Sequence, residues 1–213
     1  MKHLKTLALA AVAVGALVAL IGVGTASASV LCSTTTTPCN SKWPKGTVLS
    51  YSLVKGTTEK FATTPGESFD TCSESTDEGA VVVEGTETES EEESTTSLTF
   101  SGCTFVTKTV QACPFRVDSI AKSDNGTVTV AGNGCDLTIN TVLFGSCTFG
   151  APAGTDVGTL TATTVNRTDA IRDINAVLNI TPGEPVGCPK SIKWTAEFTL
   201  TKPANTDLYV EPN

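Results

Sequence analysis

Apolar and polar residues alternate in short stretches along most of the chain beyond residue 46. Around the second tryptophan, Ile192, Trp194, Ala196 and Phe198 occupy every second position, which makes one face of an extended strand apolar. Thr and Val, which favour pleated strands, are frequent in these stretches. Strands are predicted at 47–54, 58–63, 80–84, 97–100, 104–110, 115–121, 127–131, 137–144, 158–165, 176–181 and 192–201.

Turn-forming pairs separate the predicted strands. Asn-Gly between two strand-like stretches is a strong hairpin signal, because both residues tolerate positive φ. The clearest case is Asn125-Gly126, which directly precedes the alternating stretch 127–130. Further pairs of this kind are Lys55-Gly56, Pro65-Gly66, Asn133-Gly134 and Pro182-Gly183.

The stretch 168–178 fits two local structures. A helix that begins at Thr168 or Asp169 would place Ile171, Ile174 and Leu178 on one face. A strand would instead align the side chains of alternate residues. We favour the strand for the second half and leave open a single helical turn near Asp169.

Residues 1–28 have the three parts of a secretory signal peptide. Lys2 and Lys5 precede an apolar segment at 7–23, and small residues end at Ala28 in an A-x-A pattern. We predict cleavage after Ala28. An uncleaved anchor is the first alternative, since the apolar segment approaches the length that spans a bilayer. Lipidation of Cys32 is the second, although Leu31 stands where a small residue is expected.

Eight cysteines follow the predicted leader, and an even number in an exported chain indicates disulfides. Zinc sites commonly contain C-x-x-C pairs, and this sequence contains none. We therefore predict that the cysteines are structural and bind no metal or cofactor. Proximity favours the pairs Cys32–Cys39 and Cys135–Cys147, and for the remaining cysteines we expect Cys72–Cys103 and Cys113–Cys188, although eight cysteines allow 105 pairings.

Strands, turns and disulfides together predict an all-β fold. We expect a disulfide-stapled β-sandwich, immunoglobulin-like or jelly-roll-like, with a partly closed β-barrel as the alternative. The expected organisation is a signal peptide at 1–28, an extended and disulfide-clipped lead-in at 29–45, and a single β-rich domain at 46–213.

The chain is acidic, with a formal net charge of -8, and its lysines and arginines are few and scattered. This argues against nucleic acid as a partner. Six glutamates lie between Glu84 and Ser94. Mutual repulsion and the lack of apolar residues predict a solvated acidic loop at 84–94. Loose cation binding is the alternative, but no D-x-D-x-D-G type loop is present to form a calcium cage.

Little catalytic chemistry remains once the leader is removed. The only histidine is His3, so Ser-His-Asp and Cys-His catalysis are excluded for a mature chain. A glycosidase needs two carboxylates that face each other across a cleft, which a sequence cannot place. The candidates are Asp70, Glu74, Asp118, Asp136 and Glu197. We predict that the protein is not an enzyme.

Aromatic side chains are the remaining candidates for a binding site. A sugar-binding platform would use exposed rings, and the available ones are Trp43, Trp194, Tyr51 and Tyr209. The alternation around Trp194 favours a core position for that ring. We expect packing roles for these residues in preference to a carbohydrate site.

Several short motifs span most of the chain after the leader: Leu31-Cys32, Leu98-Thr99-Phe100-Ser101-Gly102-Cys103, Cys147-Thr148-Phe149-Gly150, Thr159-Leu160-Thr161-Ala162-Thr163, Cys188-Pro189, Trp194-Thr195-Ala196 and Leu208-Tyr209-Val210. In these motifs the chain resembles a group of uncharacterised secreted, cysteine-containing β-rich proteins of high-GC actinobacteria. The resemblance implies export and a β-rich disulfide fold, and it carries no functional residues.

The expected function is that of a secreted, non-catalytic interaction or structural module at the cell surface or outside the cell, with an unknown partner. Contact with the cell wall or with an extracellular protein or glycan fits this expectation, and no membrane insertion is expected after leader removal. A carbohydrate- or cation-binding module is the alternative. A small carboxylate-dependent hydrolase is the weaker one.

Overall fold

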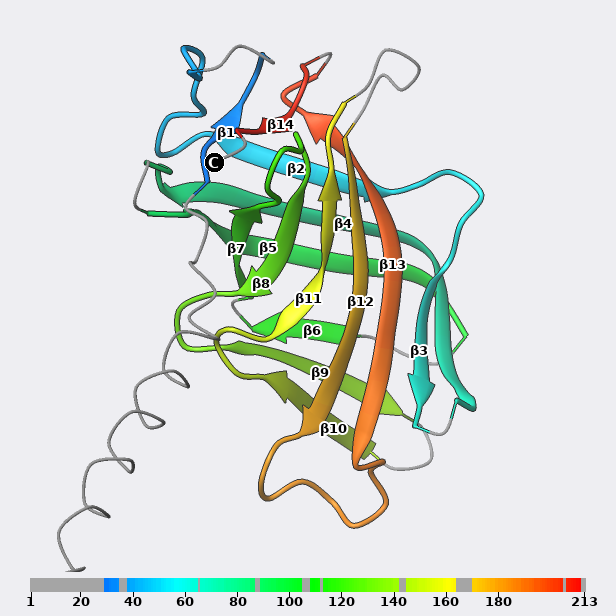
Figure 1. The fold of residues 1–213 in the computed structure, drawn as a ribbon. Coiled ribbons are helices and arrows are strands. Elements are labelled where there is room, and N and C mark those ends of the chain that lie inside the picture. The colour runs from blue at the N-terminus through cyan, green and yellow to red at the C-terminus, as the bar shows by residue number, and fades with distance from the viewer. Residues whose placement is uncertain are drawn as a thin grey trace, which may run out of the picture.

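The structure is a computed structural model, drawn in Figure 1, in which the described residues form strands and loops. The predicted leader, 1–28, lies outside the described residues, and among those described no helix is long and apolar enough to cross a membrane. The described residues are 29–34, 38–64, 66–86, 89–104, 108–111, 113–141, 145–163, 170–204 and 206–211.

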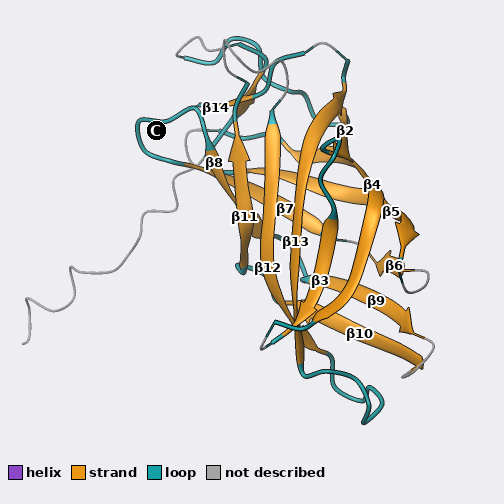
Figure 2. Ribbon diagram, turned by 90° about the vertical axis from the view of Figure 1, so that its right-hand side faces the viewer, coloured by secondary structure: helices purple, strands orange, loops and turns teal. Residues whose placement is uncertain are grey.

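The described residues form fourteen strands, and Figure 2 shows their arrangement from the side. They are β1 (Leu31–Cys32), β2 (Val48–Leu53), β3 (Glu59–Thr63), β4 (Ser68–Val83), β5 (Glu91–Cys103), β6 (Lys108–Gln111), β7 (Pro114–Ser119), β8 (Gly126–Val130), β9 (Cys135–Thr141), β10 (Gly145–Ala151), β11 (Asp156–Thr161), β12 (Ile171–Ile180), β13 (Ser191–Lys202) and β14 (Tyr209–Val210).

Eight of these strands close into an antiparallel barrel. Around the ring the order is β2, β13, β12, β11, β8, β7, β5 and β4, and pairing of β2 with β4 completes the circle. Closure leaves no open edge in this ring, which removes the usual site of edge-to-edge association. Within the core, alternate residues of each strand point inward, as Val128 and Val130 do on β8.

The four long strands β4, β5, β12 and β13 extend below this ring and carry a second level. There β3 takes the place of β2, because it also pairs with both β4 and β13. On the other side β10 pairs with the lower end of β12 and is followed in the sheet by β9 and β6. We call the eight-stranded ring the upper level and the part around β3, β10, β9 and β6 the lower level (Figure 1).

The all-β, disulfide-stapled fold predicted from the sequence is confirmed. Of the two architectures expected, the barrel describes this sheet, since one continuous sheet closes on itself. The hairpin predicted at Asn125-Gly126 is present as β7–β8. In the turn of this hairpin the residue with positive φ is Lys122, at 61°, and not Asn125 or Gly126. β12 is a strand from Ile171 onward, so no helix forms over 171–178; Thr168 and Asp169 lie outside the described residues.

All eight cysteines are in disulfides, as predicted. The pairs Cys32–Cys39 and Cys72–Cys103 are confirmed. The other two predicted pairs are wrong: the structure has Cys113–Cys135 and Cys147–Cys188. The reason for the Cys113–Cys135 pair is topological. Cys113 lies where the chain leaves the lower level, between β6 and β7, and Cys135 begins β9, where the chain returns from the upper level to the lower one.

The segment 29–45 is more than an extended lead-in. It carries the predicted Cys32–Cys39 clip, but its first residues also form strand β1, which pairs with β14. Leu31 and Val210 of this ribbon are fully buried in the main core. We call the β1–β14 ribbon the cap; it lies at the upper end of the barrel (Figure 1).

Candidate functional site

An arginine lies inside the upper level, where apolar side chains are expected. Arg172 follows the inward alternation of β12 with Ile174, Ala176 and Leu178, and it is 1% exposed. Its Nη1 lies 3.0 Å from Oδ2 of Asp77, and its Nη2 donates to Oε2 of Glu93. The guanidinium therefore joins β12 to β4 and β5 across the barrel interior.

Aromatic rings complete this cluster. The Tyr51 hydroxyl donates to Oε1 of Glu93 at 3.2 Å. The Arg172 guanidinium carbon lies 3.8 Å from the centre of the Tyr51 ring and 5.5 Å from that of Phe115. Such stacking suits arginine, because a planar and weakly hydrated guanidinium tolerates burial against ring faces.

Burial governs the ionisation of the cluster. Burial raises the pKa of Asp77 to about 6, although Arg172 partly opposes the rise. Burial disfavours the charge on Arg172, yet the fields of Glu93, Tyr51 and Asp77 hold its pKa above the ordinary value. The pKa of Tyr51 is also raised, first by burial and then by the two acidic neighbours, against the effect of Arg172.

A third acidic side chain, Glu91, lies next to the cap. Its Oε2 accepts a hydrogen bond of 2.8 Å from the Leu31 amide, and its own amide donates to the Ser29 carbonyl at 3.1 Å. Its Oε1 is buried and makes no hydrogen bond. Burial raises the pKa of Glu91 to about 9; the Leu31 and Gly85 amides lower it, and Glu93 and Glu84 raise it further.

The predicted acidic loop at 84–94 is therefore wrong in its second half. Strand β5 begins at Glu91, and Glu91 and Glu93 point into the barrel while Glu92 lies between them on the other face. Glu84 and Glu89 do lie in the segment before the strand. Charge repulsion and the lack of apolar residues favour a loop, but Arg172 supplies a counter-charge to Glu93 from a distant strand.

The candidate carboxylates named from the sequence are spread over four strands. Asp70 is buried at the start of β4 and accepts a hydrogen bond from the Thr71 amide, whereas Glu74 on the same strand is exposed. Asp118 on β7 binds Arg116, 3.2 Å away. Asp136 lies on β9 and Glu197 on β13. The two carboxylates that do meet, Asp77 and Glu93, were not among them.

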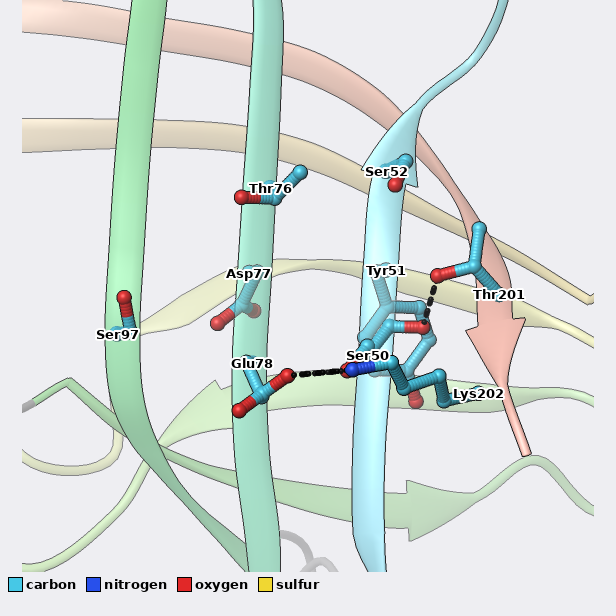
Figure 3. Close-up of a pocket in the computed structure, with 9 residues that line it drawn as sticks. All are labelled: Ser50, Tyr51, Ser52, Thr76, Asp77, Glu78, Ser97, Thr201 and Lys202. Atoms are coloured by element: carbon cyan, nitrogen blue, oxygen red, sulfur yellow. Dashed lines mark hydrogen bonds and ion pairs between the residues drawn. The ribbon is translucent and has the colours of Figure 1, made fainter. Parts of the chain in front are cut away.

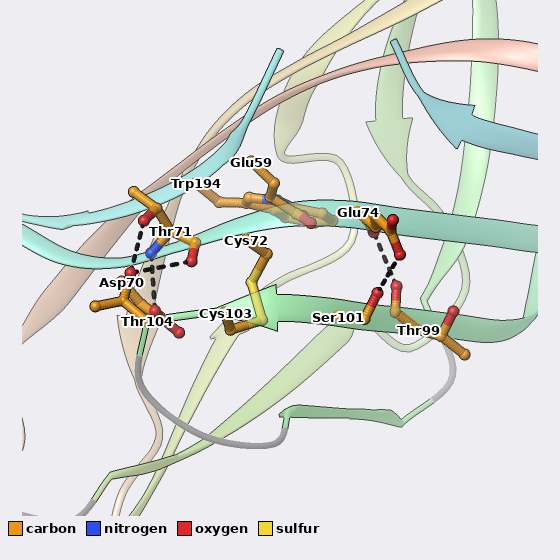
Figure 4. Close-up of a disulfide and its surroundings, with 11 residues drawn as sticks. Glu59, Asp70, Thr71, Cys72, Glu74, Thr99, Ser101, Cys103, Thr104 and Trp194 are labelled. Carbon is orange, nitrogen blue, oxygen red and sulfur yellow. Dashed lines mark hydrogen bonds between the residues drawn. A yellow bond between two sulfur atoms is a disulfide. The ribbon is translucent and has the colours of Figure 1, made fainter. Parts of the chain in front are cut away.

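The candidate aromatic platform is not formed by the described side chains. Trp194 and Tyr51 are buried in the core, Trp43 is 9% exposed, and Tyr209 is half-buried in the cap. Trp194 stacks on Phe61 with ring centres 6.1 Å apart. Its Nε1 donates to the buried Glu59 (Figure 4). The expected packing roles are confirmed for Trp194 and Tyr51.

Two groups of residues in the described part of the chain have the spacing of metal ligands. They are Cys32, Cys39 and Glu211, and Asp70, Cys72 and Cys103. In each group the two sulfurs are joined in a disulfide, as Figure 4 shows for Cys72 and Cys103. Metal binding needs thiolates, so neither group can hold an ion in the oxidised protein.

The outer surface of β2, β4 and β5 carries an ordered set of polar side chains. Because the strands are in register, Ser52, Thr76 and Thr99 form one row across the sheet. Ser50, Glu78 and Ser97 form the next row, and Glu74 and Ser101 are paired beyond Thr76. We call these eight residues the hydroxyl face. Hydrogen bonds join Thr76 to Thr99 at 2.6 Å and Ser101 to Glu74 at 2.8 Å.

A hollow of about 310 Å³ lies in the hydroxyl face where it meets the end of β13 (Figure 3). At its rim Glu78 accepts hydrogen bonds from Ser50 at 2.9 Å and from Lys202 at 3.2 Å. These two donors lower the pKa of Glu78. The volume of the hollow is at the small end of the range for ligand sites, so the hollow can receive one small polar group or one sugar-sized unit.

No protein-family model, curated protein or solved structure matches the chain. The site is therefore interpreted from its own chemistry. The interior cluster is enclosed and its two acids share Arg172, whereas the hydroxyl face is open to solvent at Thr76, Ser97 and Thr99. Alternating Thr and Ser at 95–101 were the sequence signal for this face, but the register that aligns them with β2 and β4 comes from pairing between distant strands.

Proposed function

We propose that this chain is an exported, non-catalytic module that binds an extracellular glycan, such as a cell-wall polymer, through the hydroxyl face. Four disulfides support action in an oxidising compartment outside the cytoplasm, as does the leader predicted at 1–28. The observation that carries the proposal is the register of hydroxyl-bearing side chains on three neighbouring strands around one hollow.

The chemistry of this face fits a polyhydroxylated partner. Ser and Thr hydroxyls both donate and accept hydrogen bonds, so they match sugar hydroxyls in either role. Thr76, Ser97 and Thr99 are exposed. In the described part of the chain the exposed large apolar side chains lie on separate elements, which argues against an apolar partner. They are Val48, Ile120, Val177 and Val186.

The interior cluster supports the non-catalytic part of the proposal. Hydrolysis by paired carboxylates needs an acid and a base that face a substrate. Asp77 and Glu93 instead both bind Arg172, and all three side chains are at most 7% exposed. Their geometry serves to hold strands together.

Co-sedimentation with insoluble cell-wall glycan tests the proposal. We expect the double variant Thr76→Arg/Thr99→Arg to bind at least about 10-fold more weakly than the native protein, a loss of about 1.4 kcal/mol. The matched control is Thr159→Arg/Asn175→Arg, which changes two exposed residues on β11 and β12, opposite β4 in the ring. Thermal unfolding of both variants checks that the fold is intact.

Two results would contradict the proposal. One is native protein that does not sediment with any cell-wall glycan; the other is an equal loss of binding in both variants. Repeating the assay with a chelator separates the cation-binding alternative, because glycan recognition by hydroxyls is unaffected by removal of calcium.

A further inference from the structure

Glu91 makes two hydrogen bonds to the first described residues, in addition to the β1–β14 pairing that forms the cap. Ser29 is 1% exposed and Leu31 is fully buried. Glu91 binds this segment at both ends, through its amide to the Ser29 carbonyl and through Oε2 to the Leu31 amide. The Ser29 hydroxyl also donates to the Val117 carbonyl. Ser29 is thus seated in a formed site between β5 and β7.

The loop before β5 leaves space for this segment only because it carries a glycine. A methyl group at Gly85 would overlap the carbonyl of Ser29. Backbone therefore packs directly on backbone at this point, and any other residue at 85 would displace Ser29.

The upper level is short of positive charge near Ser29. Its interior holds the carboxyls of Glu91, Glu93 and Asp77 against the single guanidinium of Arg172. Glu84 and Glu93 both act on Glu91 with negative charge. Glu91 Oε1 is buried without a hydrogen bond, and an ionised carboxylate would be costly there. With its pKa raised to about 9, Glu91 is protonated at neutral pH unless a cation lies beside it. A cation with N–H donors beside Glu91 would supply both the missing positive charge and a hydrogen bond to Oε1.

We propose that cleavage after Ala28 supplies this cation: the new α-ammonium group of Ser29 pairs with the buried carboxylate of Glu91 and locks the cap onto the barrel. The inference rests on the predicted cleavage site and is independent of glycan binding. The barrel of the mature protein is thereby distinguished from that of its precursor by one internal ion pair.

The chemistry of processing is a hydrolysis by signal peptidase. Water adds across the Ala28–Ser29 peptide bond; its oxygen joins the carbonyl carbon of Ala28, and the freed nitrogen of Ser29 takes up protons to become an ammonium. An α-amino group has a pKa near 8 and is charged at neutral pH. In an extended chain this nitrogen is at most about 7 Å from the Leu31 nitrogen that Glu91 already binds, within reach of a glutamate rotamer change.

The test compares N-termini on the exported full-length gene product. Two residues, Gly-Ser, are inserted between Ala28 and Ser29, so that processing leaves the ammonium outside the cap. We expect the insertion to lower the thermal midpoint by about 3 °C or more in the native protein. The insertion should lower the midpoint by the same amount when it is made in the Glu89→Gln variant, the control in which an exposed glutamate is changed. It should not lower the midpoint when it is made in the Glu91→Gln variant.

Labelling of the α-amine by an acylating reagent gives a second readout that does not depend on stability. The native protein should react at least about 10-fold more slowly at Ser29 than after unfolding, and Glu91→Gln should remove most of this protection. An equal loss of midpoint from the insertion in Glu91→Gln, or a native α-amine as reactive as in the unfolded chain, would overturn the proposal. So would a mature protein that does not begin at Ser29.

Discussion

Arg172 pairs with two acidic side chains that come from two other strands. Removing one member of a buried ion pair leaves the remaining charges without compensation and typically costs 3–5 kcal/mol. The unpaired Asp77 and Glu93 would then have to be protonated or hydrated inside the barrel. The inward position of this arginine thus makes the fold depend on a polar contact at its centre.

We expect Arg172→Met to lower the free energy of unfolding by about 3–5 kcal/mol, measured by denaturant titration. Adding Asp77→Asn and Glu93→Gln to this variant should restore part of the loss, because the uncompensated charges are then removed. The control is Arg116→Met, whose side chain is 36% exposed in its pair with Asp118 and should cost under about 1 kcal/mol. Similar losses for the two arginines would contradict this role for Arg172.

Asp77 also makes stability depend on pH. Its pKa rises from 3.8 in the unfolded chain to about 6 in the fold, so the folded state binds the proton more tightly. The resulting stabilisation is full below about pH 4 and is lost as pH rises through 6. Comparing native protein with Asp77→Asn, we expect the native free energy of unfolding to fall by about 2–3 kcal/mol more between pH 4 and pH 7. Parallel pH profiles would rule this out.

Single-residue patterns in the sequence anticipated the core but not the buried charges. Trp194 and Phe198 follow a strict alternation, so their inward positions could be predicted. Glu91 and Glu93 follow the same alternation, yet a run of acidic residues suggests solvent unless a counter-charge is known. The matching signal was Arg172, which shares the alternation of Ile174 and Leu178, and only the register of β12 against β13 and the closed ring bring it opposite Glu93.

At the scale of strands, the sequence pattern predicts the strands with an apolar inner face over nearly their full length. It predicts the strands with polar inner positions too short. β8 and β13 have a fully apolar inner face and were predicted nearly to their ends. β4 and β5 extend over 16 and 13 residues, although only 80–84 and 97–100 were expected. Their inner positions include Ser75, Asp77 and Glu93, which are stable there because partners from other strands satisfy them. β10 was missed because Gly145 and Ser146 weaken its strand pattern.

Disulfides differ in how much of the chain they close. Cys147–Cys188 encloses a separation of 41 residues and Cys32–Cys39 one of 7. Because loop-closure entropy grows with separation, we expect the double serine variant of the first pair to lose about 4 kcal/mol and that of the second about 2 kcal/mol. Calorimetry on the purified variants measures the difference. A larger loss from the short clip would show that it acts on the folded state, through the cap.

The arrangement of the whole molecule could not be predicted from the sequence. Strand number and turn positions describe sandwiches and barrels equally well. The barrel forms through pairings such as β2 with β13 and β12 with β13, of which the first joins segments far apart in the chain. The same long-range order explains the two wrong disulfides, because proximity in sequence favoured Cys135–Cys147 while the barrel brings Cys113 beside Cys135.

The pairing of β2 with β13, together with the cap that joins β1 to β14, has a consequence for biosynthesis. Contacts between early and late segments cannot form on a nascent chain until its final strands have been made, and folds of this kind are slow to form. The ring of a growing polypeptide therefore cannot close before β13 has been synthesised. Such late closure suits the export that we propose, because a secretion channel needs an unfolded chain.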